Sequence, residues 1–389
     1  MNGLGAHIQR QLICGSGHGV NPGDLPGVSS IGSVWSVRVE WGEEKVLPSE
    51  TEEPVPGTQP DEEQTPLALT PEQEACLREI GDLRAMPLES FATVLRFENA
   101  SDLLACLRTC PLNEHQWAFR GHEKADWPVE PTVERLKKEY PKSFRNDAED
   151  YVRKAFKRRA HHYLQHLPGD RDELEWLALM RHHGAPTRLL DWTKSPYVAA
   201  FFAVAEAKEG TTSAIWAIDI DAVKGEAVRL LVQSGVIDDP KGAEFSFSEP
   251  SVFERVLLQE TNPSIIAPVQ PLKMNERATS QQSLFLCPNS LMFGFEFALK
   301  QVLKSDRDRV KAWCLEDHPE EEPLRLERLF KLYVEPQARN ELLQELHRMN
   351  VNYATLFPGL DGFARSLGTN VTVSAFKYLL GGDDVDSIV

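Results

Sequence analysis

Residues 186–205 read PTRLLDWTKSPYVAAFFAVA, and this stretch predicts the centre of the fold. Leu189–Trp192 is short and apolar, as a buried strand would be. Ser195 and Pro196 follow as an N-cap residue and a proline at the first helical position, so we expect an apolar helix through Ala205. A short strand that leads directly into a buried helix indicates a domain of mixed helix and sheet.

The surrounding sequence continues this mixture in irregular order. Helices are expected at residues 70–84, 101–108, 147–167, 171–182 and 337–349, and after Pro358. Strands are expected at residues 116–119, 213–220, 264–267, 283–287 and 329–334. The irregular order favours the α+β class, with one mixed domain over residues 67–389 whose core motifs lie at 115–365.

Residues 1–66 differ in composition from the rest of the chain. Glu43–Gln64 gathers acidic residues and four prolines with little apolar surface to bury, which predicts a largely disordered N-terminal extension. Within the extension, Ile31–Trp41 alternates apolar and polar residues as a strand does. This segment could join the main sheet or form part of a poorly ordered extension.

The net charge of the chain bears on whether it binds nucleic acids or membranes. The chain has 59 acidic and 42 basic side chains, hence a formal net charge of −17. Such an excess argues against sequence-blind adhesion to nucleic acid or to an anionic membrane, although a local basic groove stays open. The longest apolar run, Tyr197–Ala205, is far shorter than the roughly 20 residues that span a bilayer, so no membrane partner is expected.

The cysteines and the first residues bear on the compartment. The chain has six cysteines and no CxxC pair, which favours structural thiols. Met1–Arg10 lacks the pattern of a secretory signal. We therefore expect a cytoplasmic protein.

Arg120 beside Gly121 is the first candidate for anion binding. A guanidinium offers five donors in a rigid fork that matches phosphate or carboxylate, and a glycine lets a ligand approach the backbone. The alternative is a structural pair with a buried acid such as Asp191. Arg188 lies three residues before Asp191 in an apolar run, so both charges require partners. For these two residues, a buried ion pair and a direct ligand contact both stay open.

Hydroxyl and imidazole groups flank the same region. Thr193 and Ser195 stand before the apolar helix, where hydroxyls and free backbone NH groups can bind an anion or a ribose. Simple helix capping would ask for the same residues. His182 and His183 precede Gly184, where they could polarise a ligand or belong to a structural turn.

The most specific patterns are Trp117–His122, continued by Trp127–Thr132, and Met180–Pro196. Together they resemble the FRG domain, named for the Phe-Arg-Gly triplet that stands here at residues 119–121. Two later elements resemble the same family and complete a resemblance over about residues 85–370: Arg277 with Gln281-Gln282, and Leu356–Gly362.

The FRG domain is in turn similar to the ADP-ribosyltransferase fold with its split sheet. This resemblance implies NAD as substrate, with Arg120 holding its diphosphate or ribose. It also implies that Thr193 and Ser195 line the nicotinamide pocket, and that Trp192 or Phe201 walls the ring. Breaking the ribose–nicotinamide bond develops positive charge on the sugar, and a nearby fixed negative group lowers that barrier.

The chain departs from the transferase pattern at this acid. Gln282 occupies the position expected for Glu, where it would orient the nicotinamide ribose without supplying charge, and Ser283 replaces the usual Gly of the FRG family. Glu276 or another acid, a substrate-assisted route, or nucleotide binding without transfer would each account for this. The implied catalytic residues are Arg120, Gln282 and Glu276, with binding residues Phe119, Gly121, His182, His183, Thr187, Arg188, Asp191, Trp192, Thr193, Ser195, Arg277 and Gln281.

Three functions are compatible with the sequence. The leading hypothesis is NAD-dependent ADP-ribosyl transfer onto nucleic acid or protein, in a toxin or anti-phage setting that the family resemblance implies. The second is a non-catalytic module that senses NAD or another nucleotide. The third is nucleic-acid processing through the basic run Arg153–Arg159 and nearby histidines. His161, His162 and His166 lack an accompanying HExxH-type pattern, so no metal is expected.

Overall fold

The computed structural model describes residues 71–109, 116–135, 144–238, 240, 245–259, 263–314 and 327–368. All of them belong to the unit Ala68–Val389. The expectations for residues 1–66, including a strand at Ile31–Trp41, lie outside the described residues.

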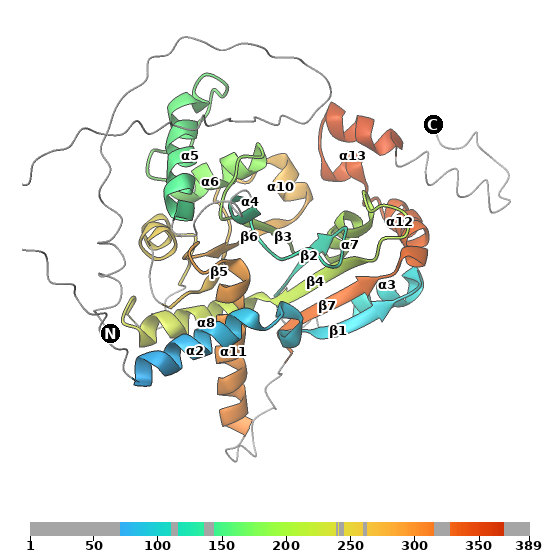
Figure 1. Cartoon of the computed structure of the whole chain (residues 1–389). Coiled ribbons are helices and arrows are strands. Elements are labelled where there is room, and N and C mark those ends of the chain that lie inside the picture. The colour runs from blue at the N-terminus through green and yellow to red at the C-terminus, as the bar shows by residue number, and fades with distance from the viewer. Residues whose placement is uncertain are drawn as a thin grey trace, which may run out of the picture. The chain divides into compact units, whose positions relative to one another are not determined.

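Seven strands form one mixed sheet in the order β1-β7-β4-β2-β3-β6-β5. β1 and β7 pair in parallel, and all other neighbours pair antiparallel (Figure 1). β2, β3 and β6 adjoin in the sheet although they are far apart in sequence. The strands are β1 (Thr93–Phe97), β2 (Trp117–His122), β3 (Leu190–Thr193), β4 (Ser213–Asp219), β5 (Ile266–Val269), β6 (Ser283–Pro288) and β7 (Leu329–Val334).

Helices pack on the sheet in two groups that belong to two hydrophobic cores (Figure 1). The first group is α2 (Pro71–Ala85), α6 (Glu173–His182), α8 (Ile220–Gln233) and α11 (Phe295–Cys314). The second is α3 (Ala100–Thr109), α7 (Pro196–Val204), α12 (Arg339–Arg348) and α13 (Tyr353–Leu356). The other helical segments are η1 (Leu88–Phe91), α4 (Thr132–Arg135), α5 (Phe144–Ala160), α9 (Pro250–Val252), the π-helical η3 (Phe253–Leu258), α10 (Glu276–Ser280) and η4 (Pro336–Ala338). Residues 360–368 are also helical, as expected after Pro358.

Strand β4 shows how one sheet serves both cores. All seven of its residues are buried. Ile215 and Ala217 belong to the core with α3 and α7, whereas Trp216 and Ile218 belong to the core with α8 and α11. Successive side chains of a strand point to opposite faces, so a continuous apolar run is what a strand covered on both sides requires.

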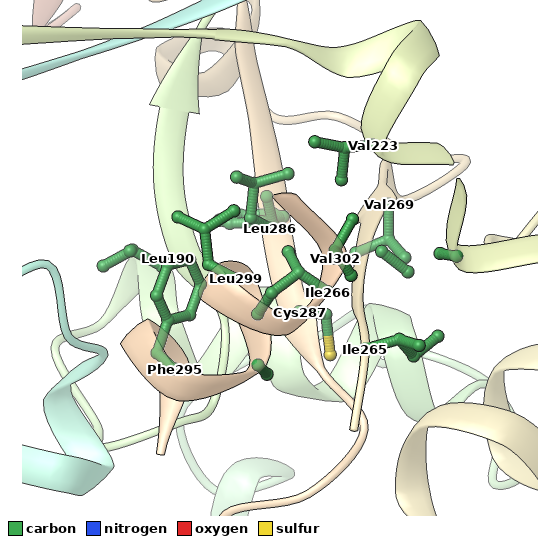
Figure 2. Close-up of a cluster of buried hydrophobic side chains, with 14 of the residues drawn as sticks. Leu190, Val223, Ile265, Ile266, Val269, Leu286, Cys287, Phe295, Leu299 and Val302 are labelled. Atoms are coloured by element: carbon green, nitrogen blue, oxygen red, sulfur yellow. The ribbon is translucent and has the colours of Figure 1, made fainter. Parts of the chain in front are cut away.

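The first core is centred on the packing of β5 and β6 against α8 and α11. Leu286 and Ile266 lie among Val223 of α8 and Leu299 of α11 in Figure 2, and all four are nearly inaccessible to solvent. Burying each such side chain contributes about 1.5–3 kcal/mol relative to leaving it exposed. This core therefore holds the β3–β6–β5 side of the sheet.

Residues 186–205 fold into a short strand followed by a helix, as expected. Ser195 caps α7, its side-chain oxygen accepting a hydrogen bond from the backbone N of Val198 at 3.3 Å, and Pro196 stands in the first turn. The short strand before it is β3. The α+β class is confirmed, whereas the similarity to the split sheet of ADP-ribosyltransferases stays a prediction.

Several expected boundaries were wrong. The helix expected at residues 147–167 ends at Ala160, and β5 lies two residues later than the expected 264–267. The strand expected to end at Phe119 continues to His122, because β4 pairs with β2 along its whole length, from Asp219 opposite Trp117 to Ala214 opposite His122. β1, α8 and α11 were not expected. Among the described residues, no helix combines the length and apolar content needed to cross a bilayer.

Candidate functional site

A cavity of about 1510 Å³ lies beside the sheet where β2, β3 and β6 adjoin, and α6 and α10 add further walls. This volume is above the 300–1,000 Å³ usual for small-molecule sites, so a large ligand fits. The cavity brings together many of the residues expected from the sequence, which come from four separate elements and one turn. Those that line it are Phe119, Arg120, Gly121, His182, Asp191, Trp192, Thr193, Arg277 and Gln281.

The Phe-Arg-Gly triplet lies within β2, so its side chains alternate between the two faces of the sheet. Phe119 is 3 % exposed and belongs to the core under α7. Gly121 lies on the same face, where an added Cβ would be 2.1 Å from the carbonyl O of Ala199. The space that the glycine leaves is therefore taken by α7. Arg120 alone points to the opposite face, towards the cavity.

Arg120 is held by two hydrogen bonds inside the domain. Its Nε donates to Nε2 of His122 at 3.1 Å, and its Nη1 donates to the carbonyl O of Asp191 at 2.6 Å. The Nη2 amino group has no hydrogen-bond partner within the described part of the chain. Two contacts thus fix the plane of the guanidinium and leave one arm of the fork for a ligand.

The protonation states support this arrangement. Burial lowers the pKa of Arg120 to about 10, with Asp191 opposing and Arg181 reinforcing the shift, so Arg120 is a cation at neutral pH. Burial lowers the pKa of His122 to about 3, and Arg120 adds to the effect. His122 is therefore neutral, and its Nε2 lone pair accepts the hydrogen bond from Arg120.

Two further arginines line the cavity with defined neighbours. Arg181 donates from Nε to Oδ2 of Asp191 at 2.6 Å, so Asp191 positions Arg181 through its carboxylate and Arg120 through its backbone. The guanidinium of Arg277 lies 4.4 Å from the ring centroid of Phe357. Because the two motifs that contain Arg277 and Phe357 are 80 residues apart, only the fold brings them to one wall.

The Gln281-Gln282 turn closes the end of β3. Oγ1 of Thr193 donates to the carbonyl O of Gln281 at 2.7 Å, and the backbone N of Lys194 donates to the carbonyl O of Gln282 at 3.0 Å. Nε2 of Gln281 donates to the carbonyl O of Leu356 at 3.0 Å, at the start of the closing motif. Gln282 has a φ of 48°, follows the last turn of α10 and exposes its side chain. Its backbone is thus explained by helix termination.

Arg188 lies outside the cavity, and the structure decides between a buried ion pair and a ligand contact for this residue. Its Nε pairs with Oε2 of Glu149 at 2.5 Å, and its Nη1 donates to the carbonyl O of Leu257 at 2.5 Å. The side chains of Arg188 and Glu149 are 4 % and 1 % exposed. Arg188 therefore belongs to a buried ion pair, and its partner is Glu149 rather than Asp191.

The other expected residues also lie away from the cavity walls. Thr187 is fully buried, and Ser195 is committed to capping α7. His183 is exposed at the C-cap of α6. Glu276 is exposed in the first turn of α10. Gln282 and Glu276, two of the three implied catalytic residues, thus do not face Arg120 across the cavity.

The cavity lining also contains residues to which the sequence reasoning gave no role, among them His122, Trp127, Arg135 and Arg181. For His122 a signal existed, because it stands two positions after Arg120 and two residues apart on a strand share a face. Trp127 belongs to a motif that was noted but given no role. Arg135 and Arg181 carry no local signal of their place, because α4 and α6 reach the cavity only through tertiary packing.

The basic run on α5 is largely paired with acids. Arg153 and Lys154 both contact Asp150, and Lys157 lies 2.8 Å from Oε1 of Glu173. These pairs reduce the positive charge that α5 can offer to a nucleic acid.

Comparison with known proteins identifies one family. Residues 115–212 match the family model described as the FRG domain. This range contains β2, β3 and α7 with both of the most specific motifs. The Arg277, Gln281-Gln282 and Leu356–Gly362 elements lie beyond it. No curated protein and no solved structure matched the chain.

Proposed function

The chain carries an FRG domain, and from that premise we propose that its cavity binds NAD and transfers ADP-ribose from it to a macromolecule. The support for the NAD site is the Arg120 fork, held by His122 and Asp191 with one arm left for a ligand. A planar guanidinium with free donors suits a diphosphate, and fixing its plane in advance reduces the entropy lost on binding.

The cavity fits such a ligand in charge and in size. Arg120, Arg135, Arg181 and Arg277 all line it, as do seven acidic residues, of which Asp191 is paired with Arg181 and Glu173 with Lys157. Positive charge is concentrated around Arg120, where the charges of Arg181 and Arg135 act against that of Asp191, and this end of the cavity would attract a phosphate. The volume of about 1510 Å³ leaves room for a dinucleotide together with part of an acceptor.

The residues of the chain would share the work as follows. Arg120 would bind the diphosphate, and neutral His122 would hold Arg120 in place. Trp192, buried on β3, would form part of the wall against a ring of the ligand. Bound NAD would supply the ribose–nicotinamide bond, whose cleavage is favoured by a nearby carboxylate. Because Glu276 lies off the cavity, Glu123 and Glu130, which line it, are the better candidates for that carboxylate.

A second function is favoured by a specific observation. Gln282 is exposed and carries no charge, and the carboxylate of Asp191 is already paired with Arg181. A domain that binds a nucleotide and does not cleave it would need the same arginines and no acid. We keep this nucleotide-sensing module as the alternative.

The test compares the wild-type chain with Arg120→Lys. Purified protein is incubated with bacterial lysate and with NAD that carries a radiolabel in its adenylate phosphate, and both transferred label and released nicotinamide are measured. Lysine keeps the charge but has no planar fork that His122 and Asp191 can hold while a further arm binds the ligand, so transfer and NAD affinity should fall at least about tenfold while the circular dichroism spectrum is unchanged. Arg158→Lys, at an exposed position on α5, is the matched control.

The outcomes separate the two functions. Label transfer with nicotinamide release, both reduced in Arg120→Lys, supports the transferase. Saturable NAD binding without nicotinamide release supports the sensing module. Full activity in Arg120→Lys would make Arg120 structural and refute the proposal. The toxin or anti-phage setting predicts that induced expression slows growth of a bacterial host, and that Arg120→Lys relieves the effect.

A further inference from the structure

Trp127 is a large aromatic side chain that stays exposed to solvent in the folded domain. It is 41 % exposed and lines the cavity. Tryptophan is on average strongly buried, because its ring loses more apolar surface to the interior than almost any other side chain. An exposed indole at a cavity that gathers four arginines therefore needs an explanation other than the stability of the core.

The loop that carries Trp127 is pinned on both sides. The backbone N of Ala125 donates to the carbonyl O of Thr212 at 2.9 Å, and the carbonyl O of Ala125 accepts from Nζ of the buried Lys331 at 2.6 Å. The backbone N of Val129 donates to Oε1 of Glu296 at 2.9 Å. Ala125 and Val129 are buried, whereas Trp127, which lies between them, is exposed and lines the cavity.

Trp127 also has a defined position relative to the Arg120 fork. Its ring lies 6.4 Å from the ring of His122, centroid to centroid, with the planes tilted by 59°. His122 in turn accepts the hydrogen bond from Arg120 at 3.1 Å. A single imidazole thus separates an exposed indole from a guanidinium, and in a nucleotide a single sugar likewise separates the ring from the phosphate.

We propose that Trp127 is the stacking platform for a heteroaromatic ring of the nucleotide whose phosphates Arg120 binds. The inference rests on the proposed function and specifies which surface of the cavity takes the ring. Stacking on an aromatic face is sequence-tolerant and strong for any planar base, and a rigid loop loses little entropy when the ring binds. Adenine and nicotinamide share this chemistry, and the experiment distinguishes them.

The experiment measures by calorimetry the affinity of the full chain for NAD, for ADP-ribose, which lacks nicotinamide, and for nicotinamide mononucleotide, which lacks adenine. Trp127→Ala should weaken NAD binding about 5- to 150-fold, whereas Trp127→Phe keeps a stacking face and should lose little. A loss seen with ADP-ribose and not with the mononucleotide assigns the platform to adenine, and the reverse assigns it to nicotinamide. Tyr151→Ala, at an aromatic residue on α5 that is 74 % exposed and outside the cavity lining, is the matched control.

The outcomes distinguish failure of the stacking platform from failure of the proposed NAD site. If the wild type binds NAD and Trp127→Ala binds it equally well, or if Trp127→Phe loses as much as Trp127→Ala, the platform is refuted and the proposed function stands. If the wild type binds none of the three ligands, the proposed function fails and the platform falls with it. Because Trp127 is exposed, the variants should keep the circular dichroism spectrum and the unfolding midpoint of the wild type.

Discussion

Replacing Gly121 with alanine should destabilise the domain through α7 and not through the cavity. An added Cβ would lie 2.1 Å from the carbonyl O of Ala199 and 2.5 Å from the backbone N of Ala203. Both are main-chain atoms of a buried helix, so neither can turn aside as a flexible side chain would. Real Cβ contacts essentially never fall below 3.0 Å.

The size of the effect follows from the movement required. Restoring 3.0 Å from 2.1 Å means a displacement of 3.0 − 2.1 = 0.9 Å between α7 and β2. That shift opens the contacts of Phe201, which is 1 % exposed, and of the alanines around it. Overpacked cores lose about 1–3 kcal/mol, and a clash with backbone on both sides belongs at the upper end, about 3 kcal/mol. In a domain of this size the melting temperature should fall by roughly 6 °C.

Urea unfolding followed by circular dichroism measures this loss of free energy. Gly225→Ala on α8 is the control, because an added Cβ there meets nothing within 4 Å, and alanine in a helix gains about 0.5–1 kcal/mol. An unfolding midpoint for Gly121→Ala equal to that of the wild type or of Gly225→Ala would refute the account of the triplet as a helix-packing element.

Two further predictions concern buried charge. Burial lowers the pKa of His122 from 6.5 to about 3, so the stability that its neutral form contributes is full above pH 6.5 and declines towards pH 3. Between pH 6.5 and 5 the free energy of unfolding of the wild type should therefore fall by about 2 kcal/mol more than that of His122→Gln. Equal pH slopes for the two proteins in urea titrations would contradict this. Arg188→Met should lower the free energy of unfolding by about 3–5 kcal/mol, because it leaves Glu149 charged and without a counter-charge in the interior. The double variant with Glu149→Leu should recover much of this loss. A double variant no more stable than Arg188→Met would show that the ion pair is not the cause.

The local elements were predictable where their signals are local. α7 begins where Ser195 and Pro196 predicted, because an N-cap hydrogen bond and a fixed proline φ act within one turn of chain. The end of β2 was not predictable in this way. Its last residues, Arg120–His122, hold few apolar side chains, and they are a strand because β4 supplies partners for their backbone.

In the candidate site, too, some features have local sequence signals and others depend on tertiary contacts. Once β4 extends β2 to His122, strand alternation places Phe119 and Gly121 towards α7 and the side chain of Arg120 towards the cavity. A strand ending at Phe119, as the sequence predicted, would not have separated them. The partners of the charges do not follow from the sequence. Arg188 and Asp191 stand three residues apart, yet they bind Glu149 and Arg181.

From its order of residues alone, this chain determines a short buried strand and a capped apolar helix, and it marks Arg120 as a candidate for anion binding. Tertiary structure alone decides that His122 holds that arginine, that the Gln281 turn meets Leu356, and that Trp127 stands at the cavity. The physical reason is the distance along the chain over which each interaction acts. Caps, prolines and side-chain alternation act between neighbours in the chain, whereas an ion pair or a cavity wall depends on which distant segments the two cores press together.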